Sequence, residues 1–426
     1  MSVVRRFAGL WSSQYWDAEK IRAYQTRQVL EVLRHAVLNV PFYRGLGIDA
    51  ASLRSAADLE RFPLLTKQEV QARASDFISD GLQASDLHSS RSSGSTGEPL
   101  TTYFDRDSWL INKYALKLRR TAAAGLGAVA RLLIVDDEPT AGAGLAWLGH
   151  LPRGPAYKRI SVYDDIESAS ATLRAFRPTA VYAFPSWFTE IVRHAEHQGR
   201  PLPPIAAAFT SSEVLTATAR RRIERAFGAA VFDIYGSTEF KEVAWQCRHG
   251  RYHVNFESTW IETCADDDAA EPSLLVLTTL NNRAMPLIRY SIQDRARVGH
   301  GSCACGRHSQ YLEQIDGRRI EVLLLADGRR LSPYTLDAAI DSIPGIAKFQ
   351  LVQPRKGCLS VQYVAKPGSS DEPLERELAA RLRAAVGEID LDFKRCDTLP
   401  RGPAGKHRML IQPAARVTGG DTNRRA

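Results

Sequence analysis

The sequence lacks any long hydrophobic run. No window of about 18 residues is both apolar and free of charged side chains, so no membrane-spanning helix is expected. A signal-peptide pattern is also missing, because Arg5 and Arg6 precede the polar and aromatic stretch 11–20 rather than an apolar segment. These absences predict a cytoplasmic protein with no membrane partner.

Clustered positive charge is scarce, although the formal net charge is +8. The arginines are scattered, apart from short clusters at 220–225 and in the C-terminal tail. No basic stripe and no nucleic-acid-binding motif accompanies them, so we expect no nucleic-acid partner. A positive balance of this size also attracts small anionic ligands.

Cysteine is sparse, with 6 residues in 426. In a cytoplasmic chain these thiols do not indicate a disulfide framework. Cys247, His253, Cys303 and Cys305 offer three thiolates and one imidazole, a set that Zn²⁺ accepts in tetrahedral geometry. Four protein ligands would make the site structural rather than catalytic. His249 is the alternative to His253, and free buried thiols are the alternative to any metal.

The first two thirds of the chain alternate between strand and helix patterns. Length and composition, with 44% hydrophobic and 24% charged residues, indicate a globular protein of two or three domains. Strands separated by helical patterns of 10–15 residues predict a parallel sheet covered by helices. The expected strands are 131–135, 180–184, 205–210 and 230–234, and the expected helices are 17–38, 107–121, 165–176, 186–198 and 214–227.

After residue 250 the pattern changes to short strands, expected at 252–260, 272–280 and 295–298. The residues 316–319 (Asp-Gly-Arg-Arg) read as a hinge. Beyond them, the pattern predicts a compact α+β unit of about 100 residues. Its expected strands are 320–325, 346–353 and 359–365, and its expected helices are 334–342 and 372–387.

We therefore expect an α/β fold with three parts. An N-terminal domain (1–316) combines α/β subdomains with a small β-rich subdomain at about 247–316. A small, mobile α+β domain follows at 317–413. Residues 414–426 are rich in glycine and arginine and are expected to be a disordered tail.

A loop rich in glycine and hydroxyl side chains occupies residues 92–99. Glycines allow the backbone to approach a bound polyphosphate closely, and backbone N–H groups and hydroxyls donate to its oxygens. The loop is not a Walker P-loop, because Glu98-Pro99 stands where that motif has lysine and serine or threonine. The alternative is an ordinary linker. The candidate phosphate-binding residues are Ser92, Ser93, Gly94, Ser95, Thr96 and Gly97.

A second polar turn, 235–239, directly follows the expected strand 230–234. Ligands of parallel α/β sheets bind at the carboxyl ends of strands. Tyr235 can stack on a flat base, Thr238 can donate to a phosphate, and Glu239 can ligate Mg²⁺. The alternative is an exposed turn in which Ser237 or Thr238 caps a helix.

Two further candidate ligand-binding residues, Asp294 and Lys406, lie later in the chain. Asp294 follows the segment 286–290, and a carboxylate after a strand can accept from both ribose hydroxyls of a nucleotide. Lys406 lies among Gly402, Pro403 and Gly405, and its ammonium can neutralise charge that develops on a phosphate. A turn aspartate and a solvated lysine are the simpler interpretations of each residue alone.

Taken together, these segments resemble the adenylate-forming superfamily of acyl-CoA synthetases and, more closely, the phenylacetate–CoA ligase family. The similarity extends over residues 25–412, and the order of the motifs is more specific than any one of them. The segments typical of that family are 35–44, 62–67, 278–280 with 286–290, and 303–307.

The resemblance implies an acid–thiol ligase that uses Mg·ATP to convert a carboxylic acid to an acyl-adenylate, with release of pyrophosphate. The acyl group then passes to an acceptor, either the thiol of coenzyme A or, in an amide- or ester-forming ligase, an amine or hydroxyl. A non-catalytic nucleotide-binding relative is the third class. The protein is expected to be a monomer or a homodimer.

The resemblance also assigns roles to residues. Ser93 to Gly97 would surround the ATP phosphates, and Lys406 would drive the first half-reaction. Thr238 and Glu239 would bind phosphate and metal, Asp294 would bind the ribose, and Arg318 would assist at the ribose or a phosphate. The residues expected near the adenine and the acyl group are Ser211, Ser212, Glu213, Tyr235, Gly236 and Ser237.

Aromatic residues at 182–187, and at 240 beside the turn 235–239, suggest a pocket for an aryl or arylacetic acid. The alternative is that they belong to the hydrophobic core. The candidate substrate-binding residues are Tyr182, Phe184, Ser186, Ser211 and Phe240, with Pro185 and Trp187 beside them.

The chain departs from the family pattern at two places. Ser291-Ile292-Gln293 precedes Asp294 where relatives usually have a Thr-Gly pair, so the local backbone is expected to differ. Arg319-Ile320-Glu321 stands where relatives usually have paired aspartates at the hinge. The second departure bears on rotation of the small domain and on whether the acceptor is coenzyme A.

Overall fold

The computed structural model describes residues 9–92, 99–127, 130–136, 156–264, 273–318, 323–327, 329–331, 336, 339–340, 343–400 and 409–411. These residues form two compact units, one up to Arg318 and one from Leu323 onward. The predicted domain boundary after residue 316 falls inside strand β13 (Tyr311–Arg318). The expected tail lies outside the described residues.

The N-terminal segment is helical, as its apolar spacing predicts. Helix α2 (Ala18–Asn39) begins at Asp17, whose carboxylate accepts from the backbone N–H of Lys20, and it ends before Pro41. The capping box predicted at Thr66 and Glu69 is present at the start of α4 (Lys67–Ala72). The other short helices are α3 (Pro41–Arg44), η1 (Ala50–Ser52), η2 (Ala56–Arg61), η3 (Ala74–Phe77) and η4 (Ala84–Asp86).

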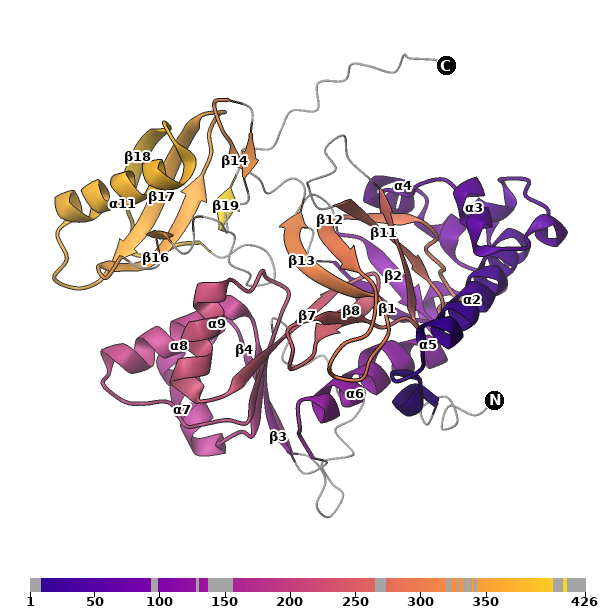
Figure 1. The fold of residues 1–426 in the computed structure, drawn as a ribbon, viewed down its shortest axis with the longest axis horizontal. Coiled ribbons are helices and arrows are strands. Elements are labelled where there is room, and N and C mark those ends of the chain that lie inside the picture. The colour runs from indigo at the N-terminus through magenta and orange to yellow at the C-terminus, as the bar shows by residue number, and fades with distance from the viewer. Residues whose placement is uncertain are drawn as a thin grey trace. The chain divides into compact units, whose positions relative to one another are not determined.

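An eleven-stranded sheet dominates the larger unit, in the order β10-β11-β12-β13-β9-β8-β7-β6-β5-β3-β4 (Figure 1). Its parallel half confirms the four strands predicted from the αβ alternation and adds one that was missed, β4. The strands of this half are β3 (Arg131–Asp136), β4 (Ala156–Ser161), β5 (Ala180–Ala183), β6 (Ala207–Ser211) and β7 (Ala230–Ser237).

Helices cover both faces of the parallel strands, which is why these strands are almost continuously apolar. One face packs against α7 (Ile166–Phe176), α8 (Pro185–His197) and α9 (Ala217–Phe227). The alternate residues, such as Phe209 and Phe232, pack toward the end of α6. That helix belongs to a continuous run of α5 (Arg106–Leu110), the π-helical segment η5 (Ile111–Ala115) and α6 (Leu116–Ala123).

The β-rich part does not form a sheet of its own. Strand β8 pairs antiparallel with β7, so the later strands continue the same sheet. The strands of this half are β8 (Lys241–Gln246), β9 (Tyr252–Val254), β10 (Thr259–Cys264), β11 (Ser273–Thr279), β12 (Tyr290–Gly299) and β13 (Tyr311–Arg318).

The single strand predicted at 252–260 is wrong, because a turn separates β9 from β10. At this turn the Asn255 side chain donates to the carbonyl of Glu242 (2.8 Å) and accepts from Arg119 (2.7 Å). Arg119 also forms a buried ion pair with Glu257 (2.7 Å). These polar side chains bind α6 to the turn, and alternation of apolar residues does not reveal such contacts.

The hairpin of β1 (His88–Arg91) and β2 (Thr101–Phe104) forms a separate two-stranded sheet. Its strands pair from His88 with Phe104 to Arg91 with Thr101. The connection between them is the glycine- and hydroxyl-rich loop. Leu100, at the end of that loop, is fully buried in the same core cluster as Tyr235.

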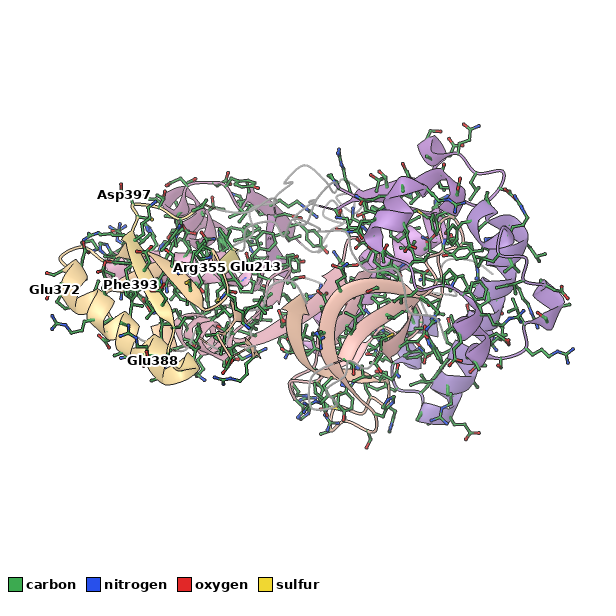
Figure 2. The ribbon with its side chains drawn as sticks, turned by 90° about the horizontal axis from the view of Figure 1, so that it is seen from above. Glu213, Arg355, Glu372, Glu388, Phe393 and Asp397 are labelled. Carbon is green, nitrogen blue, oxygen red and sulfur yellow. The ribbon has the colours of Figure 1, made fainter. Side chains whose placement is uncertain are left out.

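The second unit has a four-stranded sheet in the order β18-β17-β16-β19, with helix α11 (Asp371–Val386) packed on it. Figure 2 labels Glu372 in the first turn of α11 and Glu388 just beyond its last residue. The strands predicted at 346–353 and 359–365 and the helix predicted at 372–387 are confirmed, whereas most of 334–342 lies outside the described residues. The strands of this unit are β14 (Leu323–Leu324), β15 (Arg330–Leu331), β16 (Ile346–Val352), β17 (Cys358–Ala365), β18 (Asp390–Arg395) and β19 (Leu410–Ile411).

Among the described helices, none has the length and apolar character needed to cross a membrane.

Candidate functional site

The turn that follows β7 is tightly constrained. Ser237 pairs with Lys241 across the β7–β8 ladder, so only Thr238, Glu239 and Phe240 connect the two strands. The backbone N–H of Phe240 donates to Ser237 Oγ (3.1 Å) and closes the turn. A Cβ at Gly236 would lie 2.1 Å from the carbonyl oxygen of Lys241, so only glycine can occupy that position without a backbone shift.

This turn meets the segment that carries Asp294. The hydroxyl of Tyr235 donates to Asp294 Oδ2 (2.8 Å), although the two residues are 59 positions apart. The hydroxyl of Tyr290 donates to Glu239 Oε1 (3.3 Å). Because β12 is not adjacent to β7 in the sheet, these side-chain contacts and not strand pairing join the two candidate segments.

Arg318 and Asp294 are also neighbours. Their Cα atoms are register partners in the β12–β13 ladder, which places the backbone of Arg318 directly opposite Asp294. The residue before Asp294, Gln293, has a φ of +64°. This left-handed conformation costs a non-glycine residue about 1–2 kcal/mol, so the absence of glycine here leaves the backbone strained.

Two N-terminal motifs, 35–44 and 62–67, contact the start of β12 and the segment before it. The backbone of Leu65 accepts from Ser291 N–H (2.8 Å) and donates to the carbonyl of Arg289 (2.9 Å). The hydroxyl of Tyr43 donates to the carbonyl of Pro286 (3.0 Å) and accepts from the N–H of Ile288 (3.0 Å). These contacts explain why segments 35–44 and 62–67 accompany the 286–290 segment: they position the strand that bears Asp294.

Glu213 is held by the neighbouring helix. Its two carboxylate oxygens accept from the backbone N–H and the hydroxyl of Ser186, each at 2.9 Å. Ser186 lies in the first turn of α8, where the helix dipole favours a carboxylate. Ser212, just before Glu213, has a φ of +72°. In this structure Glu213 therefore positions the 211–213 turn against α8.

Two of the aromatic substrate candidates are core residues. Phe184 and Phe240 are 5% and 2% exposed and belong to different core clusters. Tyr182 is only partly buried, and its hydroxyl is hydrogen-bonded to Ser211. Burial raises the pKa of Tyr182 above its usual value, and the Ser211 contact opposes that shift. Tyr182 and Ser211 thus remain the candidates at the ends of β5 and β6.

The candidate phosphate-binding loop, residues 92–99 (called the phosphate loop below), is described only at its ends. Ser93 to Glu98 lie outside the described residues, and so does Lys406. Ser92 N–H donates to the carbonyl of Leu100 (2.8 Å), and Leu100 N–H donates to Ser92 Oγ (2.8 Å). These two bonds hold Ser92 and Leu100 together at the end of the β1–β2 hairpin.

Sequence reasoning missed Lys241, the first residue of β8. Its ammonium is hydrogen-bonded to Ser90 Oγ on β1, two residues before the phosphate loop. Burial, followed by the charges of Lys113 and Lys117, lowers the pKa of Lys241 to about 7, and Glu239 opposes the shift. A charged residue two positions after Glu239 was the only sequence signal, and it resembles an ordinary surface lysine.

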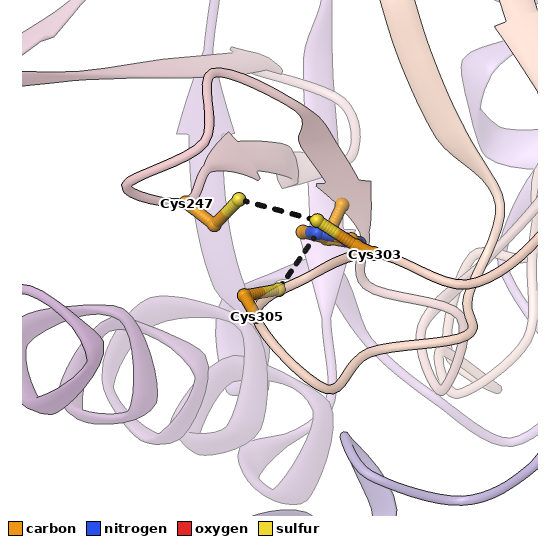
Figure 3. Close-up of side chains that lie close together, drawn as sticks. Cys247, Cys303 and Cys305 are labelled. Atoms are coloured by element: carbon orange, nitrogen blue, oxygen red, sulfur yellow. Dashed lines mark hydrogen bonds between the residues drawn. The ribbon is translucent and has the colours of Figure 1, made fainter.

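The four predicted metal ligands come together in the folded chain. The ligand atoms of Cys247, His253, Cys303 and Cys305 all lie within 4.8 Å of one another. Cys247 Sγ is 3.8 Å from Cys303 Sγ, and Cys305 Sγ is 3.2 Å from His253 Nε2 (Figure 3). Two thiolates on one tetrahedral Zn²⁺ are about 3.8 Å apart, as follows from Zn–S bonds of about 2.3 Å.

Two matching turns present the thiols. In each turn the cysteine N–H donates to the carbonyl four residues later, and the glycine three residues later donates back to the cysteine carbonyl. Both glycines have a positive φ, 80° at Gly250 and 84° at Gly306. His249 is exposed and lies outside the cluster, whereas His253 is 1% exposed and has Ser309 Oγ 3.4 Å from its other ring nitrogen. The geometry favours His253 as the imidazole.

Known proteins resemble this chain over most of its length. Phenylacetate-coenzyme A ligase of Thermus thermophilus is 26% identical over 387 residues, with 84% of each chain covered. The phenylacetate-coenzyme A ligase of Escherichia coli (strain K12) is 27% identical over 421 residues, covering 90% of this chain and 93% of the relative. The chain is thus similar in sequence to phenylacetate-coenzyme A ligases over most of its length. No protein-family model matches it.

The fold comparison agrees. A crystal structure of 2-hydroxyisobutyryl-CoA ligase, in the postadenylation state with 2-HIB-AMP, superposes with a TM-score of 0.78 at 19% identity. The match covers 94% of this chain and 91% of the other. The relatives confirm the resemblance seen in the motifs, and the superposition confirms the α/β fold of acyl-CoA ligases.

Proposed function

We propose that this protein is an AMP-forming acid–thiol ligase: it converts a carboxylic acid to an acyl-adenylate with Mg·ATP, releases pyrophosphate, and transfers the acyl group to coenzyme A. The observation that carries the proposal is the hydrogen bond from Tyr235 to Asp294, which joins two candidate nucleotide-binding segments. It occurs in a chain whose relatives, matched over 84–90% of its length, are named phenylacetate-coenzyme A ligases.

In the first step, an oxygen of the substrate carboxylate attacks the α-phosphorus of ATP, and the bond from that phosphorus to the bridging oxygen of pyrophosphate breaks. No protein nucleophile is needed, so catalysis rests on placement and charge neutralisation. Thr238 would donate to the α-phosphate, and Glu239 would hold Mg²⁺ through the oxygen that does not accept from Tyr290. Lys406 would neutralise charge that develops on the phosphate.

The nucleoside would be held by the paired segments. One oxygen of Asp294 accepts from Tyr235, and the same carboxylate would also accept from ribose hydroxyls. Arg318 would assist at the ribose or at a phosphate, and its Cα is the register partner of that of Asp294. Gly236 and Ser237 would border the base, and Ser212 would approach it from the end of β6.

In the second step, the sulfur of coenzyme A attacks the carbonyl carbon of the adenylate. The bond from that carbon to the phosphate oxygen breaks, AMP leaves, and the thiol proton passes to solvent or to the departing phosphate. The C-terminal domain (317–413) would act as the mobile cap that withdraws Lys406 between the steps. We propose cytoplasmic action as a monomer or homodimer.

The experiment is a pyrophosphate-release assay on the purified chain with Mg·ATP, a panel of aryl, arylacetic and alkyl acids, and coenzyme A present or omitted. We expect acid-dependent release, with phenylacetate as the first acid to test, and thioester formation when coenzyme A is added. Release with an amine or hydroxyl acceptor but not with coenzyme A would replace the thiol ligase with an amide- or ester-forming one. No release with any acid would contradict adenylation.

We also propose that Cys247, His253, Cys303 and Cys305 hold a structural Zn²⁺. The support is the 4.8 Å cluster of ligand atoms, because thiolates and imidazole form the set that Zn²⁺ binds in closed tetrahedral sites. The ion would join the turn after β8, which supplies Cys247, to the turn before β13, which supplies Cys303 and Cys305.

Replacing Cys303 with serine is expected to reduce bound zinc from about one to well under one per chain and to lower the thermal midpoint. Plasma emission spectrometry and calorimetry on protein purified without added metal measure both. Cys264→Ser is the matched control, because Cys264 is a free, partly exposed thiol outside the cluster. Wild-type protein with no zinc would remove the assignment.

A further inference from the structure

Lys241 occupies a backbone position that disfavours lysine. Its φ is +62°, a left-handed conformation that glycine adopts far more readily. The position is also fixed, because the carbonyl of Lys241 packs against Gly236 so closely that no Cβ can stand there. A lysine held in this conformation beside Glu239 carries a cost in stability, and such costs recur at functional sites.

The side chain of Lys241 turns toward the hairpin that carries the phosphate loop. Its ammonium is hydrogen-bonded to Ser90 and lies 5.0 Å from the ring centre of Phe104 and 4.9 Å from that of Trp109. It forms no salt bridge with any residue that the structure describes. The ammonium is therefore enclosed by a hydroxyl and two aromatic faces, with donor capacity beyond the single bond to Ser90.

A second ammonium contacts the same indole ring. Lys113 Nζ lies 4.3 Å from the ring centre of Trp109, the same indole that Lys241 approaches. Lys113 belongs to the π-helical segment Ile111–Ala115, and π-turns within helices are frequent at functional sites. The charge of Lys113 helps to lower the pKa of Lys241, so an anion close to both ammonium groups would be stabilised by both.

The phosphate loop itself supplies no positive charge. Residues 92–99 contain no lysine or arginine, and they include one acidic residue, Glu98. Backbone N–H groups and hydroxyls can hold phosphate oxygens, but they do not neutralise the charge of a triphosphate. The strand that leads into this loop ends at the exposed Arg91, whereas Lys241 reaches the same strand from β8 and is hydrogen-bonded to Ser90.

We propose that the ammonium of Lys241, supported by that of Lys113, binds the anionic phosphates of ATP and of the departing pyrophosphate. The assignment rests on the proposed adenylation function. It is favoured over binding of a second anionic group on the acid, because the contact to Ser90 ties Lys241 to the phosphate-loop hairpin. The positive charge that this loop lacks would thus be supplied from the first residue of β8.

The depressed pKa of Lys241, about 7, provides a specific signature. The charged groups around it are Lys113 in η5, Lys117 in α6 and Glu239 in the turn. The His88 ring stacks on the Trp109 ring, with 5.1 Å between the ring centres. A bound polyanion favours the charged ammonium and raises its pKa. In the protein without ligand at pH 8, the Lys241 side chain is mostly the neutral amine. Binding of phosphate should therefore be accompanied by uptake of a proton at Lys241, and the affinity for phosphate should fall as the pH rises above 7.

The test is titration calorimetry of Mg·pyrophosphate and Mg·ATP into the full chain at pH 8, in two buffers of different ionisation enthalpy. Lys241→Met should weaken binding about 10- to 100-fold, the usual effect of losing a charge-assisted hydrogen bond. It should also abolish the proton uptake seen in wild type. Lys113→Met should cause a smaller loss, and Lys158→Met, at an exposed lysine of the same unit, should cause none.

A second variant serves as the control for correct folding. Lys241→Gly suits the left-handed backbone, so its thermal midpoint should equal or exceed that of wild type while phosphate binding falls as in Lys241→Met. Unchanged phosphate affinity in both variants would overturn the inference. The inference would also be overturned if Lys241→Met raised KM for the acid and left KM for ATP unchanged, because Lys241 would then bind the acid and not the phosphates.

The two proposals fail separately. Acid-dependent pyrophosphate release by wild type, with phosphate binding indifferent to Lys241, would leave the ligase function intact and reject this inference. Lys241-dependent binding of Mg·ATP without release for any acid would reject the ligase function and keep the phosphate site.

Discussion

Lys406→Ala is expected to slow acid-dependent pyrophosphate release by about 10²–10³-fold, the typical loss when one charge-stabilising group is removed from a transition state. The lysine lies outside the described residues, so this prediction depends on its setting among Gly402, Pro403 and Gly405 and on the resemblance. Single-turnover measurement of pyrophosphate with saturating Mg·ATP isolates the adenylation step from later events.

The second half-reaction separates a catalytic lysine from a structural one. Adenylate supplied directly, with coenzyme A, should still be converted to thioester by Lys406→Ala, because the proposed role belongs to the first step alone. Lys394→Ala is the matched control, since Lys394 is an exposed lysine on β18. Release unchanged in Lys406→Ala, or lost equally in Lys394→Ala, would contradict the assigned role.

Gly236→Ala is expected to lower pyrophosphate release by about 10²-fold and to destabilise the larger unit by about 1–3 kcal/mol. The reason is steric: the added Cβ would lie 2.1 Å from Lys241 O and 3.0 Å from the carbonyl carbon of the same residue. The strands must separate, which displaces Glu239 and the hydroxyl of Thr238 together. Steady-state kinetics and thermal unfolding measure the two effects.

Gly127→Ala is the control for this substitution. A Cβ at Gly127 has no atom within 4 Å, and its backbone needs no positive φ. Wild-type kinetics are expected there. Normal activity and normal stability in Gly236→Ala would show that the β7–β8 turn accommodates the added methyl group. That result would contradict the proposed role of this turn in placing Glu239.

Local sequence patterns predicted much of the larger unit. The parallel strands are nearly all apolar because helices cover both faces, and glycine, proline and capping residues mark the ends of those helices. The pattern failed at β8, whose segment Lys241–Gln246 mixes charged and apolar residues although most of it is buried. Its Glu242 is buried through an ion pair with Arg120 (3.1 Å), a partner that no local pattern identifies.

The candidate site was predicted as separate segments, and its connections were not. The order of the motifs suggested a shared nucleotide, but the hydrogen bonds from Tyr235 to Asp294 and from Tyr290 to Glu239 are visible only in the fold. The aromatic pocket shows the opposite case. Phe184 and Phe240 looked suited to an aryl acid, yet both are buried in the core, because an aromatic side chain next to a motif packs wherever apolar area is available.

The amino-acid sequence alone determined which residue types are available, and these keep their chemical character wherever they lie: thiols and an imidazole that suit zinc, carboxylates that suit a metal ion or ribose hydroxyls, and glycines that suit a phosphate. Tertiary structure decided which of them meet. It brought Cys247 to within 3.8 Å of Cys303, 56 residues away, and it placed Lys241 against the hairpin that begins at His88. Contacts of this kind depend on strand order and register, which long-range packing sets and which no local stretch of sequence encodes.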